Sequence, residues 1–197
     1  MIPKIIHYCW FGGKPLPKLA QKCKASWEKF FPYYEIREWN ETNYDVNAVP
    51  YTKYCYEHKL WAYLSDYMRL DVVEKEGGLY FDTDVEVVKK PEDLLASCRA
   101  YFGWETPEYI NTGLGFAAEP HHPAVKAMLK MYEDLVVDGK YMHEKMQGCP
   151  QLNTKALFPF GLKQDGTQQN VCDAVILPID YLCPYKDATG ELNKTEN

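Results

Sequence analysis

Short apolar runs alternate with amphipathic segments in the first quarter of the chain. Residues 4–9, KIIHYC, form an apolar run that enters a loop at Trp10-Phe11-Gly12-Gly13, which predicts a buried strand. Residues 18–31, KLAQKCKASWEKFF, have helical periodicity and stop before Pro32, and residues 34–40, YEIREWN, alternate like a second strand. This strand, helix, strand order predicts an α/β fold with a Rossmann-like, parallel start.

The pattern continues with a long helix and further strands. Residues 52–76 are expected to be largely helical, with Gly77 or Gly78 as the C-cap, and residues 77–88 to form a strand at once after it. We then expect a short helix at 91–97, strands at 100–104 and 111–119, a helix at 123–136, and a loop-rich last third with one apolar run at 174–182. Because 197 residues show no repeat or linker, we predict a single domain, 1–197.

A row of acids is the first chemical feature in this pattern. In GGLYFDTDVEVV, residues 77–88, alternation along a strand would place Tyr80, Asp82, Asp84 and Glu86 on one face. Carboxylates so close together repel one another unless a cation joins them, and an Asp-x-Asp arrangement suits Mg²⁺ or Mn²⁺ with a phosphorylated ligand. An edge strand whose acids only face water explains the same pattern equally well.

The preceding helix strengthens the case for a ligand site. At about 100° per residue, Asp66 and Arg69 share a stripe with apolar residues, namely Ala62, Leu70 and Val73. A buried ion pair contributes little net stability, so such charges are better explained if the stripe borders a polar ligand. A purely structural ion pair is the alternative interpretation.

Composition and charge exclude several functions. The net charge of −6 disfavours a nucleic-acid partner, because that binding depends on Lys and Arg at phosphates. No apolar run approaches the length of a membrane span, and the N-terminus lacks the pattern of a secretory signal. Seven scattered cysteines without a C-x-x-C motif indicate reduced thiols, so we expect a cytoplasmic protein.

The segment LWAYLSDYMRLDVVEKEGGLYFDTDVEV resembles the S-D-x-x-R helix, G-G turn and D-x-D strand of glycosyltransferase family 32, which is related to the clostridial glucosylating toxins. IPKIIHYCWFG at the N-terminus extends the resemblance. The resemblance implies a GT-A type fold with a mixed central sheet. It also implies a metal-dependent, retaining transferase that moves a hexose from a UDP- or GDP-sugar to a saccharide, in capsule or other surface polysaccharide synthesis, in the cytoplasm or at the cytosolic face of the inner membrane.

The resemblance also assigns residues. Asp82 and Asp84 would hold the Mn²⁺ or Mg²⁺ ion, with Asp82 also reaching the ribose, the donor sugar or a metal-bound water. Asp66 and Arg69 would contact the donor sugar and its phosphates beside Ser65, which gives Asp66, Arg69 and Asp82 as the catalytic set. The remaining nucleotide contacts would be Trp10, stacking on the base, Tyr80 and Asn111. Core packing is the alternative for Trp10, and a turn amide is the alternative for Asn111.

Two features depart from the family pattern. Family members usually have a Gly-Pro pair after the long helix, whereas this chain has Gly148-Cys149-Pro150. Members also commonly continue to a tail with His and Trp that closes over the metal, whereas this sequence stops at ELNKTEN. We therefore expect the domain to lack a C-terminal active-site element.

Two other functions remain open. A phosphohydrolase of the haloacid dehalogenase type also uses D-x-D, but it needs that motif on the opening strand. The third hypothesis is a non-catalytic module that binds nucleotide sugars. A calcium loop fails because Val87 stands where glycine is required. Of the histidines, we expect His121 and His122 at the surface and His7 in the core or the pocket wall.

Overall fold

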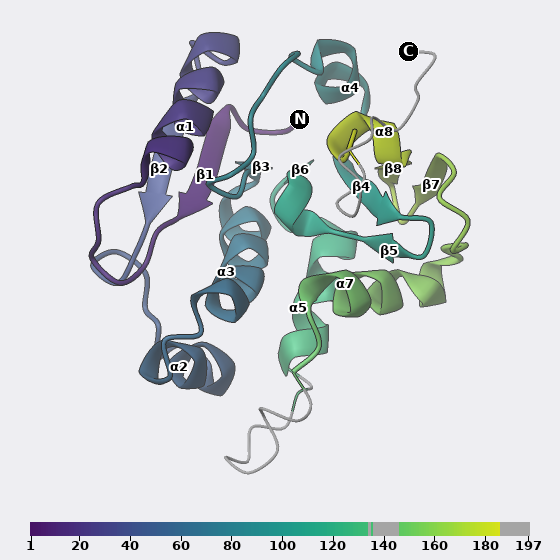
Figure 1. Cartoon of the computed structure of the whole chain (residues 1–197). Coiled ribbons are helices and arrows are strands. Elements are labelled where there is room, and N and C mark those ends of the chain that lie inside the picture. Colours follow the sequence, from purple (N-terminus) through teal and green to yellow (C-terminus); the bar gives the residue numbers. More distant parts are fainter. Residues whose placement is uncertain (134, 136–145, 186–197) are drawn as a thin grey trace.

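The computed structural model describes residues 1–133, 135 and 146–185, and its elements alternate between helices and strands (Figure 1). The helices are α1 (Lys18–Phe30), α2 (Pro50–Glu57), α3 (Trp61–Glu76), α4 (Glu92–Ser97), α5 (Pro123–Glu133), α7 (Cys149–Leu157), α8 (Ile179–Leu182) and the 3₁₀ turns η1 (Thr112–Leu114) and η2 (Phe158–Phe160). The strands are β1 (Ile5–Cys9), β2 (Glu35–Trp39), β3 (Gly78–Tyr80), β4 (Ala100–Thr106), β5 (Tyr109–Ile110), β6 (Phe116–Ala118), β7 (Gln169–Val171) and β8 (Ala174–Leu177).

These strands form one mixed sheet in the order β2-β1-β3-β6-β4-β8-β7, with β5 paired to β4. β1 pairs in parallel with both β2 and β3, and β4 pairs in parallel with β8. Only β6, between β3 and β4, and the short β5 and β7 are antiparallel to their partners. The predicted α/β fold, its parallel start and its mixed central sheet are confirmed.

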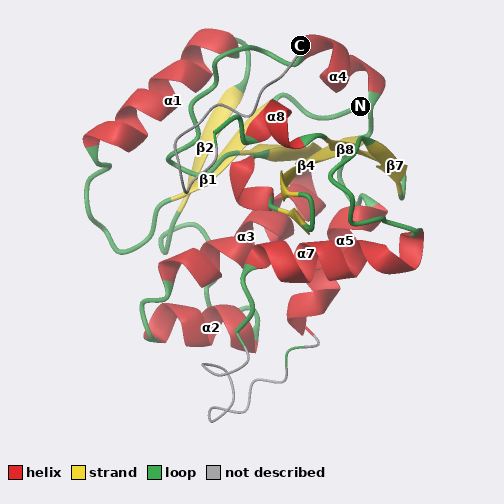
Figure 2. Cartoon of the chain, turned by 45° about the vertical axis from the view of Figure 1, so that its right-hand side comes forward, coloured by secondary structure: helices red, strands yellow, loops and turns green. Residues whose placement is uncertain are grey.

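Successive side chains along the strands pack alternately into two apolar cores, one on each face of the sheet. In β4, Tyr101 joins the cluster that contains Trp27 of α1, while Phe102 joins the larger cluster with the residues of α3, α5 and α7. Figure 2 shows α1, α4 and α8 on one side of the sheet and α2, α3, α5 and α7 on the other. Among the described helices, none combines the length and apolar character needed to cross a bilayer.

The parallel strands bring several chain segments to one edge of the sheet. β1, β3, β4 and β8 all run in the same direction, so their carboxyl ends, and the amino end of β6, lie at that edge. Ligands of open α/β sheets bind at this edge, because loops rather than strands follow there. A ligand site is therefore expected among the loops that follow the carboxyl ends of these strands.

The predicted acidic strand 77–88 is wrong beyond Tyr80. After Phe81 donates to the His7 carbonyl at 3.1 Å, the chain turns, and Val85 N–H bonds the Asp82 carbonyl at 3.0 Å. The loop then docks on α1, where the Trp27 indole N–H donates to the Val85 carbonyl at 2.8 Å. Side chains of α1, Trp27 and Ser26, thus replace a neighbouring strand as hydrogen-bond partners, and the expected single acidic face does not form.

Two other predicted elements are divided in the structure. The helix predicted over 52–76 is two helices, because Lys59 has φ 57° and Leu60 N–H turns back to the Cys55 carbonyl. The strand predicted over 111–119 begins as the turn η1, where the Asn111 side chain accepts from Gly113 N–H, and only then becomes β6. The C-cap at Gly77 is confirmed, with φ 65°.

The histidine predictions have mixed outcomes. His7 is fully buried, as one of the two expected placements, with Nε2 2.8 Å from the Gly77 carbonyl and Nδ1 accepting from the Trp39 indole at 3.0 Å. His121 is exposed as expected, but His122 is fully buried, so its surface prediction is wrong. Its Nδ1 accepts from Ala124 N–H at the start of α5, a capping role that holds the ring inside.

Candidate functional site

A large cavity lies at the sheet edge where the parallel strands end. Its volume is about 2120 Å³, and its wall includes the ends of β1, β3 and β4, the first turns of α3, the loop after β3, and α8. Of the predicted site residues, the ones that line it are Trp10, Ser65, Asp66, Arg69, Asp82, Asp84 and Asn111. Three segments that are distant in the sequence therefore meet at one cavity.

Arg69 is the centre of the charged cluster. Its Nη2 lies 3.1 Å from Asp66 Oδ1 and 3.1 Å from Asp82 Oδ1, and its Nε donates to the Ser65 carbonyl at 3.1 Å. The guanidinium is 4% exposed, against 11% for Asp66 and 31% for Asp82. Burial lowers the pKa of Arg69, but the two carboxylates outweigh it, so this pKa lies well above its ordinary value.

Asp66 is a carboxylate held between two helices. Besides its ion pair with Arg69, it lies close to Cys149, at the first turn of α7, whose polar groups lower the pKa of Asp66. Burial nevertheless raises the pKa of Asp66 to about 6, with Asp82 adding to the effect. The site thus places a carboxyl group that titrates near neutrality against the cavity.

Asp82 and Asp84 differ in how far they are engaged. Asp82 Oδ1 is shared by Arg69 and by the Tyr80 hydroxyl, which donates at 2.9 Å, whereas Asp84 is exposed. Glu86, the third acid of the motif, also lines the cavity, but its carboxylate pairs with Lys22 at 2.8 Å. The three acids therefore differ in their partners and not in their access to the cavity: Asp82 is bound by Arg69 and Tyr80, Glu86 by Lys22, and Asp84 is exposed.

The fit of a divalent cation rests on the two aspartates. Among the described residues no group of three His, Cys, Asp or Glu side chains could enclose a metal ion. Asp82 and Asp84 could still supply two oxygens, and Mg²⁺ and Mn²⁺ commonly take the rest of their shell from water and substrate phosphates. The donor set fits an ion that arrives together with a phosphorylated ligand.

Tyr80 lies beneath the site rather than in its wall. Its side chain is 1% exposed and does not line the cavity, and the Arg69 guanidinium lies over its ring at 5.1 Å from the centroid. Tyr80 thus positions Asp82 and Arg69, and the structure gives it no face toward a nucleotide.

Asn111 has the turn role that the sequence left open, and it also lines the cavity. Its Oδ1 accepts from Gly113 N–H at 2.7 Å and from the Cys149 thiol at 3.1 Å. Gly113 itself passes so close that an added Cβ would lie 2.7 Å from Asp82 Oδ2. Only glycine permits that approach, so η1 closes the cluster from the side of β6.

The cavity has residues that the sequence patterns did not single out. Trp61, at the first turn of α3, stacks on Phe11 with ring centroids 6.4 Å apart and lies against Gly12, so a second indole accompanies Trp10. Cys149 and Glu105 also line the wall. No local motif marks Trp61 or Glu105, and Cys149 stands out in the sequence only because it interrupts the Gly-Pro pair. The reason is that α7 and β4 reach the site through the topology of the sheet.

A protein-family profile matches part of the chain. Residues 17–101, which include α3 and Asp82 to Asp84, match the profile of a family described as "Glycosyltransferase sugar-binding region containing DXD motif". A search of curated proteins found no match.

Two of the similar solved structures are glycosyltransferases. "PaToxG Glycosyltransferase" is 20% identical, with a TM-score of 0.58 over 80% of this chain and 68% of that chain. A "glycosyltransferase involved in the glycosylation of the major capsid of PBCV-1" is 14% identical, with a TM-score of 0.43 over 89% of this chain and 82% of that chain. The likeness to the first structure shows the fold: the chain has a GT-A-like mixed α/β sheet, and within residues 17–101 it is similar to the DXD sugar-binding region of glycosyltransferases.

Proposed function

We propose that this chain is a glycosyltransferase that moves a hexose from a nucleoside-diphosphate sugar to a hydroxyl of a saccharide acceptor. One observation supports this most strongly. Asp66, Arg69 and Asp82 converge on a single cavity, in the segment that matches the DXD sugar-binding profile. A buried ion cluster gains little stability by itself, so its position against a cavity favours ligand binding.

Each residue has a role that its surroundings support. The Arg69 fork can donate to phosphate or sugar oxygens, and Asp66 can accept from sugar hydroxyls. Trp10 and Trp61 offer indole faces for the base, and stacking of this kind contributes about 1 to 3 kcal/mol per base. Asp82 and Asp84 would hold the Mn²⁺ or Mg²⁺ ion, which when bound offsets the charge on the departing diphosphate.

Retention of anomeric configuration is part of the proposal. The acceptor oxygen would form its bond to the anomeric carbon on the face from which the diphosphate leaves. The bonding electron pair departs with the phosphate oxygen, and the hydroxyl proton passes to that oxygen. We place this reaction in the synthesis of a surface polysaccharide, on the resemblance given above.

Neither rival function gains support from this geometry. A phosphohydrolase of the haloacid dehalogenase type would need its nucleophilic aspartate at the end of the opening strand, and β1 ends instead at Cys9 and Trp10. The carboxylate of Asp82 is already engaged by Arg69 and Tyr80. A module that binds nucleotide sugars without turnover is distinguished from an enzyme by measuring both donor binding and donor turnover.

The test compares Asp84→Ala with Glu86→Ala, an acid in the same loop that pairs with Lys22. Donor binding is measured by calorimetry with UDP- and GDP-sugars, with and without Mn²⁺, and donor hydrolysis is followed by mass spectrometry. We expect Asp84→Ala to abolish Mn²⁺-dependent binding or turnover and Glu86→Ala to leave both intact. Unchanged Mn²⁺ dependence in Asp84→Ala would contradict the role of Asp84. Binding without turnover would favour the module, and phosphate release from p-nitrophenyl phosphate the hydrolase.

A further inference from the structure

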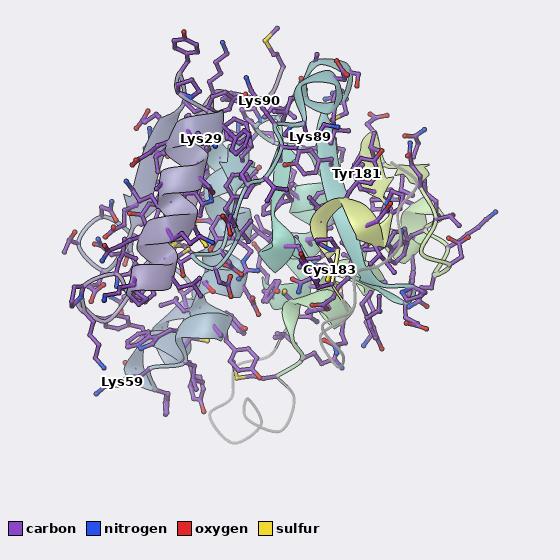
Figure 3. All side chains as sticks on the ribbon, turned by 45° about the horizontal axis from the view of Figure 1, so that its top comes forward. Lys29, Lys59, Lys89, Lys90, Tyr181 and Cys183 are labelled. Atoms are coloured by element: carbon purple, nitrogen blue, oxygen red, sulfur yellow. The ribbon has the colours of Figure 1, made fainter. Side chains whose placement is uncertain are left out.

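The cavity is larger than one nucleotide sugar requires. Sites for small molecules commonly measure about 300 to 1,000 Å³, whereas this cavity measures about 2120 Å³. Its second wall, away from the cluster at Arg69, is formed by Glu105 of β4, Gln168, and α8 with the residues after it. Figure 3 labels Tyr181 and Cys183 on this wall, at α8 and just beyond it. A second substrate would have room there.

Glu105 is placed on this wall by the alternation of β4. Trp104 is fully buried in the core on the α3 side, so Gly103 and Glu105 face the other way. At Gly103 the strand is covered by α8, since an added Cβ would lie 2.5 Å from Leu182 Cδ1. Two residues further on, Glu105 faces the cavity.

The carboxylate of Glu105 is held in place but has no counter-charge. Its Oε1 accepts from Asn111 Nδ2 at 2.9 Å, and the orientation of that amide is fixed because Asn111 Oδ1 accepts from Gly113 and Cys149. Among the described residues no Lys, Arg or His forms an ion pair with Glu105. Glu105 therefore presents an anchored hydrogen-bond acceptor beside the charged cluster.

A negatively charged hydrogen-bond acceptor in this position determines which ligand group can bind beside it. A diphosphate would be repelled by Glu105, whereas a hydroxyl group would donate to it. We propose that Glu105 binds the attacking hydroxyl of the acceptor and orients it toward the anomeric carbon of the donor sugar. This inference rests on the proposed function. Glu105 acts by orientation: the hydroxyl proton still passes to the departing phosphate oxygen.

The test measures how the sugar is divided between an added acceptor and water. Wild type, Glu105→Gln, Glu105→Asp and the control Glu108→Gln are incubated with the donor panel and Mn²⁺, with methyl glycosides of common hexoses as acceptors. Glu108 is an exposed acid in the β4–β5 turn outside the cavity. We expect Glu105→Gln to lower the ratio of transfer to hydrolysis by about tenfold or more, the effect of losing a hydrogen bond to a charged group.

Further readouts separate orientation from structural damage. The KM for donor and the melting temperature of Glu105→Gln should stay close to wild type, the KM for acceptor should rise, and Glu105→Asp should restore part of the ratio. An unchanged ratio, or a rise in donor KM alone, would overturn the inference and leave the transferase intact. A wild-type protein that neither binds nor hydrolyses any donor would instead overturn the proposed function, and the inference with it.

Discussion

At the scale of single residues, Arg69 supplies the positive charge that compensates the carboxylates of the site. It is the positive group between two carboxylates that the fold has largely withdrawn from water. Breaking a buried ion pair by removing one partner costs about 3 to 5 kcal/mol, because the other charge stays buried and uncompensated. Arg69→Met should therefore lower the free energy of unfolding by about 3 kcal/mol, most of it from Asp66, since Asp82 keeps more contact with solvent.

The matched control is Arg99→Met. Arg99 also bridges two carboxylates, Glu119 and Asp173, but it is 55% exposed. Exposed pairs contribute about 0 to 1 kcal/mol, so urea denaturation should separate the two variants clearly. Equal losses in the free energy of unfolding would contradict the prediction that burial makes the Arg69 cluster more important for stability.

His7 gives the molecule a pH dependence at the residue scale. Burial lowers the pKa of His7, and both ring nitrogens are already bonded in the neutral form. An unfolded histidine gains a proton below about pH 6.5, whereas the folded one gains it only at lower pH. Its contribution to stability is therefore complete above that value and is lost as pH falls toward the folded pKa.

Denaturation midpoints measured from pH 7.5 to 5 check this effect. Stability of the wild type should fall over that range, and His7→Gln should flatten part of the slope. His122, whose pKa is also lowered by burial, accounts for a further part. His58→Gln, at an exposed ring on the end of α2, is the control. A slope that is the same in His7→Gln and in the control would contradict the assignment.

At the scale of elements, α1 positions the loop that bears Asp82 and Asp84, the proposed metal ligands. Ser26 Oγ accepts from Val87 N–H at 2.9 Å, beside the contact of Trp27 with Val85. Ser26→Ala leaves that N–H unpaired, which should cost about 1 kcal/mol of stability and weaken Mn²⁺ binding several-fold because the loop loses an anchor. Calorimetry with Mn²⁺ and nucleotide measures the second effect. Ser97→Ala, at a hydroxyl that bonds within α4, should leave Mn²⁺ affinity unchanged.

The turn from α3 into β3 offers a second test at this scale. Gly77 and Gly13 both have φ 65°, but an added Cβ at Gly77 would lie 2.6 Å from Pro120 Cδ, whereas nothing lies within 4 Å of one at Gly13. Both alanine variants incur the strain of a positive φ, about 1 to 3 kcal/mol, and Gly77 has ψ −175°, a combination that residues other than glycine rarely adopt. Gly77→Ala should lose about 1 to 3 kcal/mol more through overpacking, measured by urea denaturation. Equal losses in the two variants would show that the contact with Pro120 relaxes freely.

At the scale of the whole molecule, ligand binding should stabilise the fold cooperatively. The cavity wall is built from both halves of the chain, and the proposed ion lacks a complete set of protein ligands among the described residues. Mn²⁺ and a nucleoside diphosphate together should therefore raise the melting temperature well above either alone. A ligand at about 100 times its Kd stabilises by about 2.7 kcal/mol. Scanning calorimetry should show this synergy in Glu86→Ala and not in Asp84→Ala, and additive shifts would contradict a shared ion and nucleotide site.

Local pattern sufficed for much of the fold and of the cluster. β1, α1, β2 and α3 follow their hydrophobic periodicity, and the helical spacing of Asp66 and Arg69 places both on the side that faces the site. The predicted C-terminal active-site element cannot be compared, because residues 186–197 lie outside the described residues. The assignment to family 32, the donor and the acceptor stay predictions.

The sequence by itself determined the elements with strong period, the neighbouring charges on α3 and the acids after Gly78, because these depend on residues close together in the chain. Tertiary structure decided where β3 ends, which basic residues pair with acids of the motif and that His122 is buried, because each depends on partners contributed by other elements. The placing of Glu105, Cys149 and Trp61 also came from the fold alone. Parallel strands gather their carboxyl ends at one edge whatever their separation in sequence, and no local pattern records that meeting.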